Sequence, residues 1–225
     1  MEPEIIYEDP FLTVILKPAG MATQTARVAE EDLVSWFSNH RRQAGEDTYV
    51  GVLSRLDQPV EGLVAFAKDK ATTAKLTREI EDKRLQKYYL ALVHCDRAIS
   101  ADGWHRLEDF LVKDERTNSS RVVTQGEASA NKRAKRAILE YRDVSDAYDL
   151  PGGIKALDIR LVTGRHHQIR VQLANAGMPI VGDAKYGPPG DKGRRLGLFA
   201  YHLRLEHPKN EKLMDFEIRP DIGAL

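Results

Sequence analysis

The chain has 225 residues, 42% hydrophobic and 30% charged, and its 34 basic and 34 acidic residues give a formal net charge of zero. These values indicate a folded protein with one substantial core, and they exclude a disordered chain or one that coats itself in nucleic acid by bulk charge. No apolar run approaches the roughly 20 residues of a membrane-spanning helix, and the acidic N-terminus lacks a signal-peptide pattern. The single cysteine, Cys95, excludes an intrachain disulfide and a Cys-x-x-Cys metal site. We therefore expect a cytoplasmic protein.

The first half of the chain is predicted to form short strands and two helices. Apolar residues at helical spacing indicate one helix over residues 31–40. Asp69 is placed to cap a second helix, which is expected to run from residue 70 to about residue 83. Alternating apolar residues and turn signals predict strands over residues 4–8, 12–16, 50–53, 63–68 and 87–93.

The second half is richer in strands. One helix is predicted over residues 165–176, where Gly177 can end it, and the glycines and prolines of 187–193 indicate a loop. Strand-like runs occupy residues 121–124, 134–142, 155–162, 198–205 and 213–218. Many strands with few helices, without regular strand–helix alternation, favour an α+β fold with a mostly antiparallel mixed sheet.

Asp57 is the first candidate for chemistry. It lies in Ser54-Arg55-Leu56-Asp57, where the apolar run 50–53 gives way to a turn. An aspartate at such a place often bonds its own backbone, which is the structural alternative. A glycosidase-like pair with Glu61 is a further alternative, although four residues across a turn do not fix the separation that such a pair needs.

A cluster of cationic or titratable side chains stands at the start of the predicted 165–176 helix: Arg165, His166, His167 and Arg170. A helix N-terminus is partly positive, so this cluster requires a nearby anion, either a buried carboxylate, a phosphate or both. Arg165 is a candidate cation for keeping the Asp57 carboxylate ionised in a dry pocket. The alternative is a group of solvated basic side chains.

Other residues are explained as readily by structure as by function. Tyr89 is a strand tyrosine, a class that more often packs than catalyses. The spacing of the remaining histidines recommends no metal site. Basic clusters are consistent with solvated surface or with local positive faces on a neutral body, and they occur at Arg41-Arg42, Lys83-Arg84, Lys132-Arg133, Lys135-Arg136 and Arg194-Arg195.

Several motifs occur in a fixed order along nearly the whole chain. They are Tyr7-Glu8-Asp9 through Lys17-Pro18-Ala19-Gly20, Arg55-Leu56-Asp57 with Gly62-Leu63, Lys87-x-Tyr89-x-Ala91-x-Val93, Thr163-Gly164-Arg165-x-His167-Gln168-Ile169-Arg170, Gly177-x-Pro179-Ile180-x-Gly182-Asp183 with Tyr186-Gly187, and a strand leading into His207-Pro208. In this order the chain resembles the RluA-type RNA pseudouridine synthases.

The resemblance implies a pseudouridine synthase fold and an enzyme that isomerises uridine in ribosomal or transfer RNA without a cofactor or metal. It makes Asp57 the nucleophile, Tyr89 the active-site tyrosine and Arg165 the partner of the Asp57 carboxylate. Arg55, which resembles the residue that fills the gap left by an extruded base, is expected to contact RNA together with the motif residues His167 and Arg170.

The same resemblance carries expectations about organisation. The family pattern begins at once, near Ile5, so a single catalytic domain over residues 1–225 is expected, without a separate N-terminal RNA-binding domain. We expect a monomer with RNA as its partner and no contact with membranes.

Two departures from the family pattern keep alternative functions open. Ser54 stands where the family usually has histidine, and Val60-Glu61 where it usually has Thr-Ser. A catalytically altered member that binds or remodels RNA is one alternative. Hydrolysis of a nucleic-acid glycosidic bond at the same carboxylate is another.

Overall fold

The computed structural model describes residues 2–25, 30–82, 84–100 and 103–223. The chain forms two compact units. Unit 1 contains the residues up to Lys87 together with Phe199–Arg219, and unit 2 contains Tyr88–Leu198 with the residues from Pro220 onward. The expected single catalytic domain over residues 1–225 stays a prediction.

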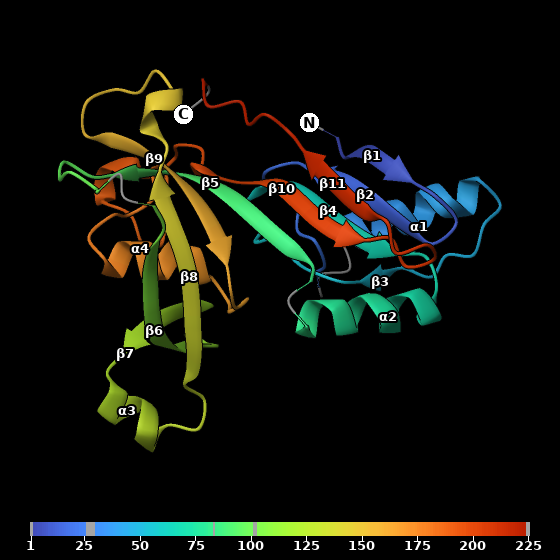
Figure 1. Cartoon of the computed structure of the whole chain (residues 1–225), viewed down its shortest axis with the longest axis horizontal. Helices are drawn as coiled ribbons and strands as arrows, with labels where there is room; N and C mark the ends of the chain where they lie inside the picture. The colour runs from blue at the N-terminus through green and yellow to red at the C-terminus, as the bar shows by residue number, and fades with distance from the viewer. Residues whose placement is uncertain (1, 26–29, 83, 101–102, 224–225) are drawn as a thin grey trace. The chain divides into compact units, whose positions relative to one another are not determined.

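The sheet of unit 1 is mixed (Figure 1). Its central strands follow the order β1 (Glu4–Glu8), β2 (Leu12–Lys17), β4 (Glu61–Ala67) and β10 (Leu198–Glu206). β3 (Gly51–Val52) pairs with β4, and β11 (Leu213–Glu217) pairs with β10. The pairings are antiparallel except that β10 runs parallel to β4.

The two helices of unit 1 begin at aspartate caps. Asp32 accepts a hydrogen bond from the backbone N–H of Ser35 at the start of α1 (Leu33–Gln43). Asp69 accepts from the N–H of Thr72 at the start of α2 (Lys70–Glu81). The predicted cap at Asp69 is confirmed, whereas the predicted end of this helix at Lys83 falls outside the described residues.

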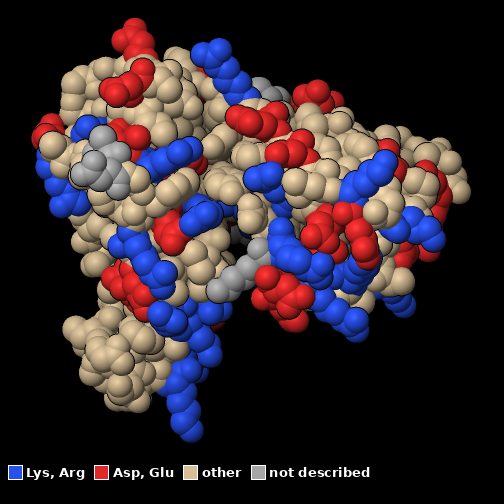
Figure 2. All heavy atoms as spheres, in the orientation of Figure 1, with Lys and Arg blue, Asp and Glu red and all other residues tan. Residues whose placement is uncertain are grey.

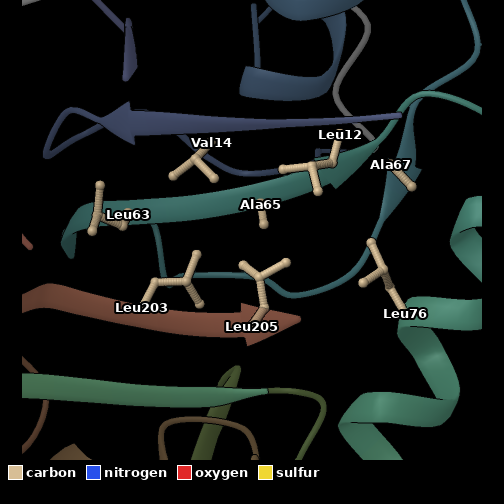
Figure 3. Close-up of a cluster of buried hydrophobic side chains, with 8 residues drawn as sticks. All are labelled: Leu12, Val14, Leu63, Ala65, Ala67, Leu76, Leu203 and Leu205. Atoms are coloured by element: carbon tan, nitrogen blue, oxygen red, sulfur yellow. The ribbon is translucent and has the colours of Figure 1, made fainter. Parts of the chain in front are cut away.

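Apolar side chains of the unit 1 sheet and of α2 form its core. Figure 3 shows one cluster in which side chains of β2, β4, β10 and α2 gather: Leu12, Val14, Leu63, Ala65, Ala67, Leu76, Leu203 and Leu205. All of them are at most 3% exposed. Truncating one of these leucines to alanine is expected to cost about 2–5 kcal/mol. The cluster ties the two ends of the chain together, because β10 comes from the C-terminal part.

The sheet of unit 2 is a series of antiparallel strands (Figure 1). Its order is β5 (Gln86–His94), β9 (Ile154–Leu161), β8 (Lys135–Asp143), β6 (His105–Asp114) and β7 (Ser119–Val123). The sequence predicts all of these except β6. Charged residues interrupt the apolar alternation of β6, so its pattern is weak.

The helices of unit 2 are short. α3 (Gln125–Ala130) is not predicted, although Thr124 and Glu127 form a capping box at its start. α4 spans Gln168–Asn175, so its predicted start at residue 165 is wrong. His167 has φ +54, a left-handed conformation that cannot continue a helix, and the residues before it therefore form a turn. The loop predicted over 187–193 contains a single 3₁₀ turn at Pro189–Asp191.

The elements confirm the predicted α+β class with a mostly antiparallel mixed sheet. Among the described residues, no helix is both long and apolar enough to span a membrane.

Candidate active site

Asp57 lies in an irregular loop of unit 1 between β3 and β4. Its side chain is half-buried, its neighbour Leu56 is buried, and Arg55 is exposed. The N–H of Val60 donates to the Asp57 carbonyl at 3.0 Å and closes the turn. Leu56 is therefore part of the core, while Arg55 and Asp57 on either side of it remain accessible to solvent.

Hydrogen bonds fix the main chain on both sides of Asp57. The Thr23 hydroxyl accepts from the Leu56 N–H and donates to the Leu56 carbonyl, each at 3.0 Å. Gly20 and Gln58 are also joined twice: the Gly20 N–H donates to the Gln58 carbonyl, and the Gln58 side-chain amide donates to the Gly20 carbonyl, each at 2.9 Å. The position of Asp57 is therefore set by residues on the segment after β2.

A buried lysine lies next to this loop. Lys17 is 0% exposed, and its Nζ donates to the carbonyl oxygens of Pro18, Met21 and Gln58 at 2.9, 2.7 and 3.2 Å. Burial lowers the pKa of Lys17 to about 8, and the negative charges of Asp57 and Glu61 partly oppose this shift. Lys17 therefore brings a positive charge to the two carboxylates and supports the loop by direct bonds.

Gly62 follows the Asp57 turn at a position where only glycine fits. Its φ is +140, and a Cβ at this position would lie 2.3 Å from the carbonyl oxygen of Ala200 in β10. No other residue type fits so close an approach of two backbones. Glu61, a departure from the family pattern, precedes Gly62 at the first position of β4.

Tyr89 lies in β5 of unit 2, directly opposite Ile159 of β9. It is 5% exposed, and its strand neighbour Tyr88 is half-buried. The predicted strand over 87–93, with Tyr89, Ala91 and Val93 on one face, agrees with this pairing.

The turn before α4, residues 163–167, carries Arg165. Gln168, the first residue of α4, holds the turn, because its Oε1 accepts from the Thr163 hydroxyl at 2.8 Å and from the Arg165 N–H at 2.9 Å. Its side-chain amide donates to the Ile138 carbonyl in β8 at 3.0 Å. Arg165 itself is exposed, and its Nε donates to the carbonyl of Arg136 at 3.0 Å.

Arg170 and His167 lie inside unit 2. Arg170 is 4% exposed and forms a two-pronged ion pair with Asp183, at 2.8 and 2.7 Å. Burial alone would raise the pKa of Asp183, but hydrogen bonds from Arg170 and its positive charge hold that pKa below its usual value. Asp183 is thus a buried carboxylate of the kind that the cationic cluster required. His167 is 8% exposed, and burial of both residues gives the predicted RNA contacts no support.

The structure divides the predicted site residues between the two units. Asp57 and Arg55 belong to unit 1, whereas Tyr89, Arg165, His167 and Arg170 belong to unit 2. The expected pairing of Asp57 with Arg165 stays a prediction. Sequence reasoning assigned no role to Lys17, Thr23, Gln58 or Gln168, and the only signal for Lys17 was its place in Lys17-Pro18-Ala19-Gly20.

Comparison with known proteins assigns the family. The sequence profile of the RNA pseudouridylate synthases matches residues 12–175. Ribosomal large subunit pseudouridine synthase C of Pasteurella multocida is 30% identical over 244 residues, which cover 100% of this chain and 68% of that protein. An uncharacterised RNA pseudouridine synthase of Bacillus subtilis is 29% identical over 219 residues, covering 95% of this chain and 67% of that protein. The chain thus spans about two thirds of the length of these relatives.

Two solved human structures share the fold. RNA pseudouridylate synthase domain containing 4 matches with a TM-score of 0.75 and 18% identity, over 98% of this chain and 89% of that one. RNA pseudouridylate synthase domain containing 1 matches with a TM-score of 0.73 and 17% identity, over 97% and 84%. The predicted pseudouridine synthase fold is confirmed. Together with the profile match, this makes the chain a member of the RluA-type RNA pseudouridine synthase family, a family of isomerases.

Proposed function

We propose that this chain converts a specific uridine of a structured RNA to pseudouridine, with Asp57 as the nucleophile. The observation that carries the proposal is the Asp57 loop, whose main chain is bonded on both sides of the aspartate and rests on the buried Lys17 ammonium. A fixed carboxylate beside a positive charge is suited to attack, because little reorganisation is needed when the reaction begins.

The reaction is an isomerisation in which atoms and charge balance. The bond between the ribose C1′ and the uracil N1 breaks, the base turns, and a bond forms between C1′ and C5. The proton on C5 leaves and N1 gains one, so no redox partner is required. Asp57 attacks or stabilises the anomeric carbon or assists removal of a neighbouring proton. Tyr89 accepts a proton or stacks on the base, and Arg165 supports the Asp57 carboxylate.

Surface charge on unit 2 supports RNA as the substrate. Lys132, Arg133 and Lys135 follow α3 and are exposed. In the part of the chain that the structure describes, no side chain of these three forms a hydrogen bond or an ion pair. Figure 2 shows basic side chains running along this part of the lobe that carries β6, β7 and α3. Exposed cations grouped on one face suit the phosphates of a folded RNA.

For the substrate we propose a class of RNA. The Pasteurella relative is named for the large ribosomal subunit, and we propose ribosomal or transfer RNA for this chain. The target uridine is expected in a loop, because extruding a paired base costs a few kcal/mol. Mapping pseudouridine in total RNA from cells with and without the gene identifies the site.

Replacing Asp57 tests the proposal directly. Asp57→Asn and Asp57→Ala should abolish conversion while leaving the melting temperature and RNA affinity close to those of the unaltered protein. Asp47→Asn is the matched control, because Asp47 is an exposed turn aspartate of unit 1 whose carboxylate bonds the N–H of Tyr49. Substantial conversion by an Asp57 variant would falsify the assignment.

Product analysis of the same reactions separates the alternative functions. Pseudouridine in the RNA supports the synthase. Free uracil supports hydrolysis of the glycosidic bond, and unchanged RNA with tight binding supports an RNA-binding or remodelling protein.

A further inference from the structure

One hydroxyl group in unit 2 joins three segments that lie far apart in the sequence. The Tyr186 hydroxyl accepts a hydrogen bond from the backbone N–H of Ser120 at 2.7 Å, and it lies 2.8 Å from Nδ1 of His167. Ser120 belongs to β7, and His167 is the last residue before α4. The hydroxyl therefore links a strand, a loop and the end of the turn that bears Arg165.

The phenol can serve both bonds, because its oxygen accepts the Ser120 N–H and a phenol can either donate to or accept from an imidazole nitrogen. The imidazole tautomer sets the direction of the bond to Nδ1 of His167. A phenylalanine at position 186 would remove both bonds at once and would leave the ring in place.

The Ser120 side chain holds the neighbouring residue of the turn. Its hydroxyl donates to the carbonyl of His166 at 2.9 Å and lies 2.9 Å from His166 Nδ1. The rings of His166 and His167 stack with centroids 3.8 Å apart. Both residues that follow Arg165 are therefore bound to groups outside the turn.

Tyr186 is itself held rigidly. Asp183 Oδ1 accepts from the N–H of Tyr186 at 3.1 Å and from the N–H of Lys185 at 2.9 Å. The guanidinium of Arg170 lies 5.3 Å from the centroid of the tyrosine ring. The Arg170–Asp183 pair thus fixes the loop from which Tyr186 reaches the turn.

We propose that Tyr186 and Ser120 are positioning residues for Arg165. The left-handed conformation of His167, at φ +54, is uncommon for a residue with a side chain, and surrounding contacts must maintain it. Tyr186 binds that residue, while Ser120 binds the one between it and Arg165. Loss of these bonds lets the turn change conformation, and the exposed Arg165 guanidinium then occupies a wider range of positions. The inference rests on the proposed function, which gives Arg165 its role.

Tyr186→Phe tests the inference. Its kcat for pseudouridine formation should fall about 10–100-fold, while KM for the RNA should change less than about 3-fold, because a misplaced group costs rate rather than binding. Tyr49→Phe is the control: its hydroxyl bonds Thr73 in unit 1 and is not part of the turn, so kcat should stay unchanged. Unaltered kcat in Tyr186→Phe, or an equal loss in both variants, overturns the proposal.

A double variant distinguishes positioning from general damage. Under single-turnover conditions with excess enzyme, Tyr186→Phe should slow the Arg165→Lys protein much less than it slows the unaltered protein, because both changes act on one group. If the rate of the double variant instead falls by the product of the two single-variant factors, the proposal is overturned. If Tyr186→Phe does not fold, Ser120→Ala replaces it, with Ser129→Ala in exposed α3 as its control.

The two proposals fail in different ways. If Arg165→Ala is fully active, Arg165 does not have the role assigned to it, and the proposed function of the turn is wrong as well. A nearly inactive Arg165→Ala beside a fully active Tyr186→Phe leaves the proposed function standing and rejects the positioning residues alone.

Discussion

The Asp57 loop of unit 1 and the Arg165 turn of unit 2 are both held by side chains from outside the segment, but they differ in which of their own groups are bound. The loop is bonded mainly through its own main chain, at Leu56 and Gln58, to Thr23, Gly20 and Lys17. The turn is bonded through its main chain, at Arg165 and His166, to Gln168 and Ser120, and through the His167 side chain to Tyr186. The loop should therefore tolerate a change at position 57 without moving, because the bonds just named are made at Leu56 and Gln58, whereas in the turn the His167 side chain itself takes part in the bonding.

The largest effect is expected at Arg165. Arg165→Ala should lower kcat about 10²–10³-fold, the range for losing one preorganised charged group. Arg165→Lys should restore little, because an ammonium does not reproduce the two-pronged grip of a guanidinium on a carboxylate. Arg136→Ala is the matched control for single-turnover assays: it keeps the backbone carbonyl that binds Arg165 and loses only the side chain that binds Glu108. Equal losses at Arg136 and Arg165 would contradict a specific role.

An intermediate effect is expected at Lys17. Lys17→Met leaves three carbonyl oxygens without their donor and removes the charge beside Asp57, so kcat should fall about 10-fold or more. Since burial lowers the pKa of Lys17 to about 8, the unaltered enzyme should also lose activity as pH rises past that value. A pH–rate profile checks both points, because the alkaline decline should be missing from Lys17→Met.

The contribution of Lys17 to the free energy of unfolding should rise with pH, whereas activity should fall. Between about pH 8 and the ordinary lysine value of 10.5, the unfolded chain keeps a proton at Lys17 that the folded protein has released. The unfolded state binds more protons there, so this group raises the free energy of unfolding as pH rises through that window. Urea titrations of the unaltered protein and of Lys17→Met measure the difference. An identical pH dependence in the two proteins would contradict a buried, proton-releasing Lys17.

The smallest effect is expected at Thr23. Thr23→Val removes both hydrogen bonds to Leu56 and should lower kcat about 3–10-fold with a loss of about 1–3 kcal/mol in unfolding free energy. Thr23→Ser keeps the hydroxyl and should behave almost as the unaltered protein. A Thr23→Val enzyme with unchanged kcat would show that the main chain near Asp57 needs no such support.

The sequence predicts strands and helices where local patterns are strong. Apolar alternation identifies β5 and β9, and the residue type of Asp69 is enough to mark the start of α2. α3 has a capping signal at Thr124 and Glu127 but is too short for a helical repeat. The predicted start of α4 is wrong because the left-handed conformation of His167 leaves no trace in the residue type.

The candidate site is less visible in the sequence than the fold. Asp57, Tyr89 and Arg165 stand out through their motifs, whereas their supports do not. Lys17 would be taken for a surface residue at the end of β2, since nothing in its local pattern shows that it is buried or that one of its carbonyl partners, Gln58, lies 41 residues away. The role of Tyr186 likewise depends on a strand, β7, that approaches it only in the folded chain. Contacts between distant segments cannot be read from spacing alone.

The parallel pairing of β4 with β10 has a consequence for the order of folding. Gly62 meets Ala200, which lies more than half the chain further on, while all the strands of unit 2 lie between them in sequence. At about 5–20 residues per second, a ribosome needs on the order of ten seconds to deliver the partner. During that interval the apolar β4 lacks one neighbour, and a nascent chain with such an edge is a natural substrate for a chaperone.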